Sequence, residues 1–200
     1  MLQSLRNRWW PAPGWLGMAM DDQGASLVEL CPQSMVRRHI ERSVDVQWPM
    51  PKQPWLDPVA CGRALSKCMT DARIQPRRLA MALPRDAVVQ DSLWMDVNLT
   101  DAEIHDQITW VASQALQLEW DAVAVDYRRE ETPTEGSVGQ VQWFWAACAQ
   151  DRVNAASQLS RVAGLRLAFL GPEPPDGVPE DGRPMRYQVA CHMAWQASRA

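Results

Sequence analysis

Residues 14–31 read GWLGMAMDDQGASLVELC, two mostly apolar runs on either side of the polar turn Asp21-Asp22-Gln23-Gly24. A polar turn that ends in glycine between two apolar runs is typical of a β-hairpin. We therefore expect strands over 14–20 and 25–31, followed by a third strand through Met35–Val46, where Val and Ile are mixed with arginines. This beginning predicts that the chain is built around a sheet.

A helix is expected after the proline-rich segment 48–54. Asp57 would be its N-cap and Pro58 its first residue, where the missing N–H of proline costs nothing. Its apolar stripe would consist of Leu56, Ala60, Ala64, Leu65 and Cys68. The next run, Leu79–Leu83, is short, apolar and bounded by Arg and Pro, and it therefore indicates a buried strand that Pro84 ends.

A second lobe is expected to begin at Arg85, with a strand over Ala87–Met95. The strongest helix pattern follows over Leu99–Leu118, where Thr100 and Glu103 have the spacing of a capping box. Leu99 and Ile104 occupy the flanking staple positions. The apolar face of this helix would consist of Ile104, Ile108, Val111, Ala115 and Leu118.

The rest of the chain predicts a hairpin, a helix, a strand and a final helix. The hairpin would pair Val123–Arg129 with Gln140–Ala149, and Gly164 would end a helix over Asp151–Ala163. Further elements are a strand over 165–170, a Pro- and Gly-rich linker over 171–184 and a helix near 187–199. The order indicates an α+β fold of two lobes, in which residues 85–163 are inserted between 1–84 and 164–200.

Composition limits the possible functions. An apolar fraction of 46% and a charged fraction of 22% are those of a folded protein. No run approaches the ~20 apolar residues of a membrane span, and the N-terminus lacks the apolar stretch of a signal peptide, so a cytoplasmic protein is expected. A net charge of −4 and a pI near 5.4 argue against direct nucleic-acid binding.

No catalytic or metal-binding pattern is evident. The five cysteines form no CxxC pair and are expected to be buried apolar residues. Cys191-His192 lacks an orienting partner, which a nucleophile and its base require. The histidines have no metal-ligand spacing among themselves or with the cysteines; they are His39, His105 and His192. The sequence contains eleven tryptophans. Trp143 and Trp145 lie on the same face of one strand, which predicts that both are in the core. Among the other tryptophans we expect an exposed side chain that anchors a partner.

The segment Gly17–Leu30 aligns without a gap with a phosphate-binding signature, G-(I/V)-D-(I/L)-G-S-S-S-(V/I)-K-(L/V)-V-E-L. Together with the phrases Ala82-Leu83-Pro84, Asp126-Tyr127 and Ala163-Gly164-Leu165, it resembles the PilM family of type IV pilus assembly proteins, relatives of FtsA in the actin-like ATPase superfamily. The resemblance covers roughly residues 14–170. It implies a partial actin-like (ribonuclease H-like) lobe with an inserted small α/β lobe.

The sequence departs from that signature where the family binds nucleotide. The family Asp near metal and phosphate falls on Ala19, the family turn Gly on Asp21, and the family Lys on Ser26. Asp22 adds a second carboxylate where an anionic ligand would sit. We therefore expect a degenerate phosphate turn, with no cofactor, no metal and no catalysis. Residues 171–184 would replace the remaining half of longer family members.

The resemblance implies a cytoplasmic scaffold at the inner membrane of a type IV pilus or DNA-uptake (competence) machine. Its partner would be the cytoplasmic N-terminal peptide of a PilN-like membrane protein, with pilus motor or platform proteins as further partners. The peptide is expected near Leu83, Pro84, Val88 and Trp94. Three alternatives remain open: the cytoplasmic scaffold of a type II secretion system, an ATP-binding actin-like ATPase, and a pseudo-enzyme that only oligomerises.

Overall fold

The computed structural model describes residues 14–21, 23–30, 40–48, 55–75, 78–130, 139–173, 189, 190 and 193. Within them the chain forms two sheets and three α-helices, which is the mixed α and β fold that the sequence predicts. The chain divides into two compact units, which are described one at a time. Unit 1 comprises residues 1–84 and 155–200, and unit 2 comprises residues 85–154.

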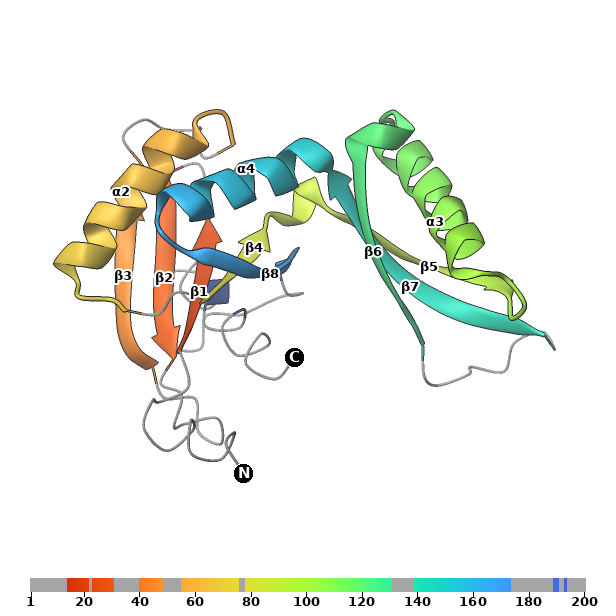
Figure 1. Cartoon of the computed structure of the whole chain (residues 1–200), viewed down its shortest axis with the longest axis horizontal. Coiled ribbons are helices and arrows are strands. Elements are labelled where there is room, and N and C mark those ends of the chain that lie inside the picture. The colour runs from red at the N-terminus through yellow and green to blue at the C-terminus, as the bar shows by residue number, and fades with distance from the viewer. Residues whose placement is uncertain are drawn as a thin grey trace, which may run out of the picture. The chain divides into compact units, whose positions relative to one another are not determined.

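Unit 1 is built on a five-stranded sheet (Figure 1) with the order β3-β2-β1-β4-β8. The expected hairpin is confirmed, since β1 (Trp15–Met20) and β2 (Gly24–Leu30) pair antiparallel, and β3 (Ile40–Gln47) extends it on the β2 side. On the other side β4 (Arg78–Leu83) pairs parallel with β1, and β8 (Arg166–Pro172) pairs parallel with β4. Parallel neighbours need a crossover connection, and here helices supply it.

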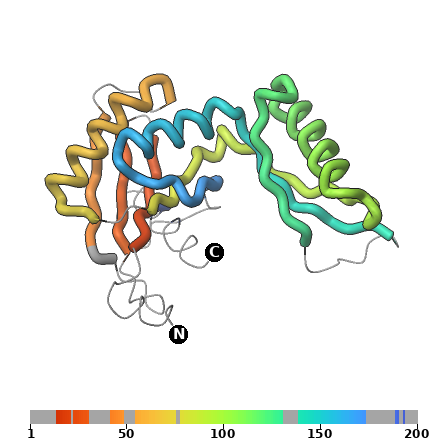
Figure 2. Tube along the Cα trace, viewed as in Figure 1, coloured from red at the N-terminus to blue at the C-terminus, as the bar shows by residue number. Residues whose placement is uncertain are grey.

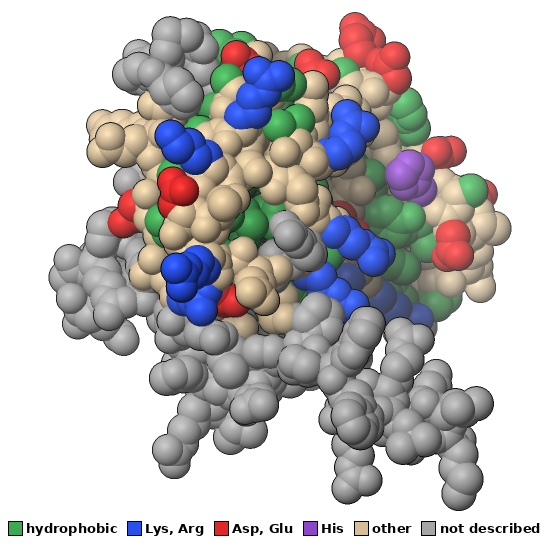
Figure 3. All heavy atoms as spheres, turned by 60° about the vertical axis from the view of Figure 1, so that its left-hand side comes forward, with side chains coloured by type: hydrophobic (Ala, Val, Ile, Leu, Met, Phe, Trp, Pro, Cys, Tyr) green, Lys and Arg blue, Asp and Glu red, His purple; other side chains and the backbone are tan. Residues whose placement is uncertain are grey.

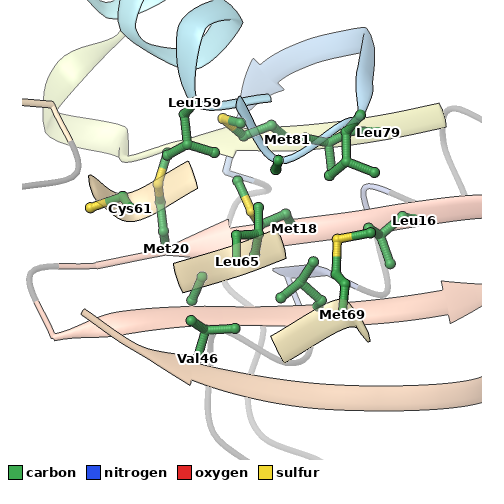
Figure 4. Close-up of a cluster of buried hydrophobic side chains, with 14 of the residues drawn as sticks. Leu16, Met18, Met20, Val46, Cys61, Leu65, Met69, Leu79, Met81 and Leu159 are labelled. Carbon is green, nitrogen blue, oxygen red and sulfur yellow. The ribbon is translucent and has the colours of Figure 1, made fainter. Parts of the chain in front are cut away.

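The helices α2 (Pro58–Asp71) and α4 (Gln150–Val162) supply apolar residues to the same face of this sheet. Figure 4 shows Cys61, Leu65 and Met69 of α2 and Leu159 of α4 beside sheet residues whose side chains alternate toward the helices. These sheet residues include Leu16, Met18, Met20, Leu79 and Met81. The intervening residues face the opposite side, where Ala19, Val28, Ala80 and Ala82 cluster with Val189, Ala190 and Met193. Both faces of the sheet are therefore buried.

The helix α2 begins as expected but buries a different stripe. The Asp57 carboxylate accepts a hydrogen bond from the Ala60 N–H at 3.0 Å, and Pro58 is the first helical residue. However, Leu56 lies in a turn before the helix and is 78% exposed, so its expected place in the stripe is wrong. The buried positions are Cys61, Leu65 and Met69, with Ala64 and Cys68 at their edge. An i, i+4, i+8 stripe one residue later than expected satisfies the same helical period.

Unit 2 is a three-stranded antiparallel sheet with the order β5-β7-β6 and one helix, α3. Its strands are β5 (Val89–Asp96), β6 (Val123–Arg129) and β7 (Gln140–Ala149), and the expected β6–β7 hairpin is confirmed. Two short 3-10 turns, η2 (Arg85–Ala87) and η3 (Trp120–Ala122), precede β5 and β6. The course of the chain through this unit and back into α4 can be followed in Figure 2.

The helix α3 (Asp101–Leu116) packs on the sheet through Ile104, Ile108 and Ala112. The expected apolar stripe is right for Ile104, Ile108 and Val111, which pack on the core of this unit. It is wrong toward the C-terminus, where Ala115 is exposed and Leu118 lies beyond the helix. The helix ends at Leu116, and its C-cap Gln117 has a left-handed φ of 55°, which breaks the helical period before Leu118. The core of this unit also includes Trp145 and Ala147, as the strand alternation predicts.

The boundaries between the parts differ from the expected ones in two places. The units divide after Asn154 rather than after Ala163, because the C-terminal part of α4 packs on the core of unit 1 through Ala156 and Leu159. The expected linker over 171–184 is wrong at its start, because β8 continues through Pro172, which pairs with Leu83. As an edge strand, β8 tolerates a proline without an N–H. Residues 174–184, and most of the expected helix near 187–199, lie outside the described residues.

The predicted capping box of α3 is confirmed. The Glu103 carboxylate accepts hydrogen bonds from the Thr100 N–H and hydroxyl, each at 2.8 Å, and the Glu103 N–H donates to the Thr100 hydroxyl at 3.3 Å. These hydrogen bonds from Thr100 lower the pKa of Glu103 below its ordinary value of 4.5. At pH values above the ordinary pKa, the box contributes its full stabilisation of the folded state. This contribution is lost as the pH falls through the lowered pKa of Glu103.

Replacing Thr100 with alanine is expected to lower the free energy of unfolding by about 1 kcal/mol at neutral pH, since an N-cap side chain is lost. The difference between wild type and variant should be smaller at pH 3 than at neutral pH, because the ionised fraction of Glu103 decreases as the pH falls toward its lowered pKa. Urea unfolding followed by circular dichroism at both pH values measures it. A difference that stays constant between the two pH values would contradict the role assigned to the charged carboxylate.

Candidate functional site

The first candidate site is the turn between β1 and β2, where the sequence places a degenerate phosphate turn. The Asp21 carboxylate accepts hydrogen bonds from the N–H groups of Gln23 and Gly24 at 2.8 and 3.0 Å. The Asp21 N–H also donates to the Gly24 carbonyl at 2.9 Å. Backbone N–H groups gathered in a turn can bind anions, and here a side chain of the same turn already occupies two of them.

This turn is fixed further by Trp48, which follows β3. Its indole N–H donates to the Asp21 carbonyl at 3.0 Å, and its backbone N–H donates to the Gln23 carbonyl at 3.1 Å. Trp48 itself is buried. Nothing in the sequence connects Trp48 with this turn, which lies 27 residues earlier in the chain. Only the pairing of β3 with β2 brings the two together.

The other positions of the phosphate signature lie inside the sheet. Gly17 is buried in β1 and pairs with Val28 of β2, and Ala19 belongs to the small cluster on the face opposite the helices. Ser26 is also buried, and its hydroxyl donates to the carboxylate of Asp45, the residue that pairs with it on β3. Asp22 lies outside the described residues. At these positions apolar packing and a neutral donor replace the charged groups that a nucleotide would contact.

The second candidate site is the face of the unit 2 sheet that points away from α3, which we call the outer sheet face. Leu93 and Met95 of β5 contact the α3 cluster, so alternation turns Trp94 to the other side. The same alternation places Phe144, Ala146 and Arg128 there. The outer sheet face is thus defined by Trp94, Arg128, Gln142, Phe144 and Ala146.

Two aromatic side chains, Trp94 and Phe144, lie on this face. Trp94 is 36% exposed and pairs with Gln142, which leaves Phe144 diagonally opposite it. Diagonal neighbours across an antiparallel pair lie within reach of aromatic side chains. The Arg128 guanidinium lies 5.3 Å from the centre of the Phe144 ring, a cation–π contact. Phe144 and Arg128 were not predicted as site residues, although the alternation that assigned Trp143 and Trp145 to the core implies their position.

The structure places the four predicted partner-binding residues in different environments. Leu83, at the end of β4, is buried, and its carbonyl accepts from the Glu173 N–H at 3.0 Å. Pro84, which ends the first segment of unit 1, and Val88, which precedes β5, are half-buried. Trp94 is the most exposed of the four. Of this set, Trp94 is therefore the side chain that presents the largest apolar surface.

The surroundings of two described cysteines, Cys61 and Cys148, disfavour the reactive thiolate form. Burial, with the charge of Asp57 adding to it, raises the pKa of Cys61 to about 11. Burial also raises the pKa of Cys148, against the opposing effect of Arg152. A thiol with a raised pKa is a poor nucleophile at neutral pH. His105 is exposed beside the Tyr127 ring, while His39 and the Cys191-His192 pair lie outside the described residues.

Metal ligation and membrane insertion find no counterpart in the described part of the chain. Among the described residues, no group of three or more His, Cys, Asp or Glu side chains is arranged to hold a metal ion. In the same residues, no helix is both long enough and apolar enough to cross a membrane.

Together these features define a two-unit α+β protein in which a small α/β unit interrupts a five-stranded mixed sheet between β4 and β8. The family model described as type IV pilus assembly protein PilM matches residues 44–170, more than half of the 200-residue chain. The chain therefore belongs to the PilM family of type IV pilus assembly proteins, which confirms the resemblance seen in its sequence. No match is found among curated proteins.

Solved structures share the fold. The chain is similar to one in the structure titled PilM-PilN type IV pilus biogenesis complex, with a TM-score of 0.62 and 21% identity over 80% of this chain and 47% of that chain. It is also similar to the cytoplasmic domain of EpsL, an inner membrane component of the type II secretion system of Vibrio cholerae. There the TM-score is 0.55 and the identity 9%, over 80% of this chain and 57% of that chain. The chain thus spans about half the length of these proteins.

Proposed function

We propose that this protein is a non-catalytic scaffold of a type IV pilus or DNA-uptake machine. In this role it lies in the cytoplasm at the inner membrane and binds the cytoplasmic N-terminal peptide of a PilN-like membrane protein. The observation that carries the proposal is membership of the PilM family over residues 44–170. The similarity to a chain of a PilM–PilN complex supports the choice of partner.

The sheet order supports an actin-like reading of unit 1. Three antiparallel strands, a helix, a parallel strand, an insertion and a second helix–strand unit follow one another along the chain. This is the order expected for a ribonuclease H-like lobe that carries an inserted small lobe, as in PilM and FtsA. In this reading unit 2 is the inserted lobe.

The turn between β1 and β2 supports the absence of nucleotide chemistry. A bound phosphate would have to displace the Asp21 carboxylate from the N–H groups of Gln23 and Gly24 and would meet its negative charge there. Like charges in close contact disfavour binding by several kcal/mol at the effective dielectric of a protein surface, about 4 kcal/mol at 4 Å. Ser26, held by Asp45, supplies no positive charge that could offset this repulsion.

The outer sheet face supports peptide binding in unit 2. Trp94 and Phe144 offer large apolar area, and aromatic residues carry a disproportionate share of the binding energy at protein interfaces. The tail of the membrane protein would contact Trp94 directly, with Val88 and Pro84 nearby in sequence. Motor or platform proteins of the pilus machine would be further partners of the assembled scaffold.

Calorimetric titration of the full chain with a synthetic N-terminal peptide of a PilN-like membrane protein tests the proposal. We expect saturable binding, no heat from Mg-ATP, and at least about tenfold weaker peptide binding by Trp94→Ala, as for an interface hot spot. Trp110→Ala, which removes an exposed tryptophan from another face of unit 2, is the matched control and should bind normally. Absence of peptide binding by the wild type, or clear binding of ATP, would refute it.

The similarity to the EpsL cytoplasmic domain supports a second candidate function, also that of a scaffold, in a type II secretion system. The titration with the PilN-like peptide separates the two, because saturable binding of that peptide supports the pilus scaffold. A protein that is recovered with type II secretion proteins instead, and does not bind the peptide, belongs to the secretion pathway. An ATPase and a purely self-associating pseudo-enzyme are distinguished by the Mg-ATP titration and by light scattering of the isolated chain.

A further inference from the structure

Trp110 lies in the middle of the solvent-facing side of α3. The core contacts of this helix come from Ile104, Ile108 and Ala112, and residues at the helical spacing of Trp110 point the opposite way. The exposed residues of that outward stripe are Glu103, Asp106, Gln107, Trp110 and Gln114. Trp110 is 59% exposed, so the packing of unit 2 does not account for a tryptophan at this position.

Two more large apolar side chains follow the helix. Gln117 turns the chain, and the Leu118 N–H donates to the Ser113 carbonyl at 3.1 Å, which holds Leu118 beside the last turn of α3. Trp120 then begins η3, which contacts α3. Leu118 and Trp120 are 36% and 45% exposed. With 1.5 Å of rise per residue, Trp110 is about 9 Å along the axis from the helix end at Leu116.

We call this surface the α3 ridge and define it by its exposed apolar and acidic residues, Asp106, Trp110, Leu118, Glu119, Trp120 and Asp121. Isolated surface tryptophans are ordinary, whereas large apolar side chains grouped among charged residues mark interaction sites. The ridge lies on α3 and η3 and does not include Trp94, which points to the outer sheet face. It is therefore distinct from the surface proposed for the membrane-protein tail.

The charge around the ridge selects its partner. Residues 86–127 contain nine Asp and Glu and no Lys or Arg. The whole of unit 2 has thirteen acidic and four basic residues, a net charge of −9, whereas the rest of the chain has eleven acidic and sixteen basic residues, a net charge of +5. Figure 3 shows several of the Lys and Arg side chains on the side of the molecule that carries α2 and β3. The negative charge is thus concentrated in unit 2, and the net charge of the whole chain, −4, does not show this because the rest of the chain is positive.

An acidic surface repels the phosphates of nucleic acids and of anionic lipids, which leaves a basic polypeptide as the complementary partner. Arg and Lys side chains also pack well on tryptophan rings, since a cation is attracted to the face of the indole. We propose that the α3 ridge docks a Lys- or Arg-rich segment of a partner protein, whose cationic and apolar side chains pack on Trp110 and Trp120. This is a second docking surface, beyond the tail-binding role.

The probe for this surface is a synthetic amphipathic helical peptide of Lys, Arg and Leu, titrated calorimetrically into the full chain at low and physiological salt. Saturable binding is expected, weaker at the higher salt because exposed charges are screened. Trp110→Ala and Asp106→Lys should each weaken it at least about tenfold. Trp94→Ala and Leu56→Ala, which remove exposed apolar side chains elsewhere, should leave the affinity unchanged, and a peptide with Glu in place of Lys and Arg should not bind.

Fluorine NMR of the protein labelled with 5-fluorotryptophan locates the contact. The Trp110 and Trp120 signals, assigned from Trp→Phe variants, should shift on titration while the Trp145 signal stays in place. The proposal is overturned if the wild type shows no saturable binding, or if Trp110→Ala binds as tightly as the wild type. It is also overturned if the chain self-associates through the ridge, seen as a concentration-dependent mass in light scattering that Trp110→Ala abolishes.

Discussion

Replacing Trp145 with alanine is expected to lower the free energy of unfolding of unit 2 by about 3–5 kcal/mol, the usual cost of truncating a buried aromatic side chain. Trp145 is 1% exposed in the middle of β7, the central strand, and packs with Ile108 and Ala112 of α3. A unit of one helix and three strands has little other apolar area to replace it. Urea unfolding with amide hydrogen exchange in β5–β7 would show the loss as reduced protection confined to unit 2.

Two further variants sharpen this test. Among the described residues the indole N–H of Trp145 has no hydrogen-bond partner, and a buried donor without a partner costs about 1–3 kcal/mol. Trp145→Phe keeps an aromatic ring and removes that donor, so it should retain most of the stability. Trp110→Ala removes an exposed tryptophan and should change stability by less than about 0.5 kcal/mol. If Trp145→Ala were as mild as Trp110→Ala, the core assignment of unit 2 would be wrong.

Replacing Gly62 with alanine is expected to destabilise unit 1, although alanine is the better helix former by about 1 kcal/mol. A Cβ at Gly62 would lie 2.8 Å from the Leu159 carbonyl oxygen and 2.8 Å from the Val162 Cβ. One of these atoms is backbone, so α2 and α4 would have to move apart over the core that Figure 4 shows. Overpacking of this kind costs about 1–3 kcal/mol, which exceeds the gain in propensity.

Thermal and urea unfolding of Gly62→Ala, with Arg63→Ala as the control, measure this effect. Arg63 is the next residue of α2 and is exposed. Its replacement by alanine therefore changes a residue of α2 without adding an atom at the contact between α2 and α4. We expect a lower midpoint for Gly62→Ala and a near-normal one for Arg63→Ala. A raised stability of Gly62→Ala, as at an exposed helical glycine, would show that the two helices do not approach as closely as described.

Local patterns predicted most of the elements in the described part of the chain. The turn at Asp21–Gly24, the N-cap at Asp57 and the capping box at Thr100 and Glu103 each depend on residues within four positions of one another, so their chemistry can be read directly. The helical stripes were less accurate at their ends. Leu56 and Leu118 fit the helical period, but the first lies before its helix and the second beyond it, and the period alone does not mark an end.

The candidate sites were predicted only in part. The resemblance pointed to the β1–β2 turn, and the sequence showed carboxylates in the place of glycine. That the Asp21 carboxylate turns inward to the N–H groups of its own turn, with Trp48 over it, required the structure. Of the predicted partner-binding residues, Leu83 is buried and Trp94 is exposed. The sequence does not reveal this difference, because both are apolar residues in strands that follow one another along the chain.

The sequence by itself determined the order of strands and helices, the caps, and the loss of the charged groups of a phosphate turn, because these depend on residue type and on neighbours along the chain. Tertiary structure decided which surfaces remain for partners. Trp145 and Trp110 are the same residue type, yet strand pairing buries one and the helix orientation exposes the other. The close approach at Gly62 likewise follows from the tertiary structure, because α2 and α4 are distant in sequence and only the fold brings them into contact.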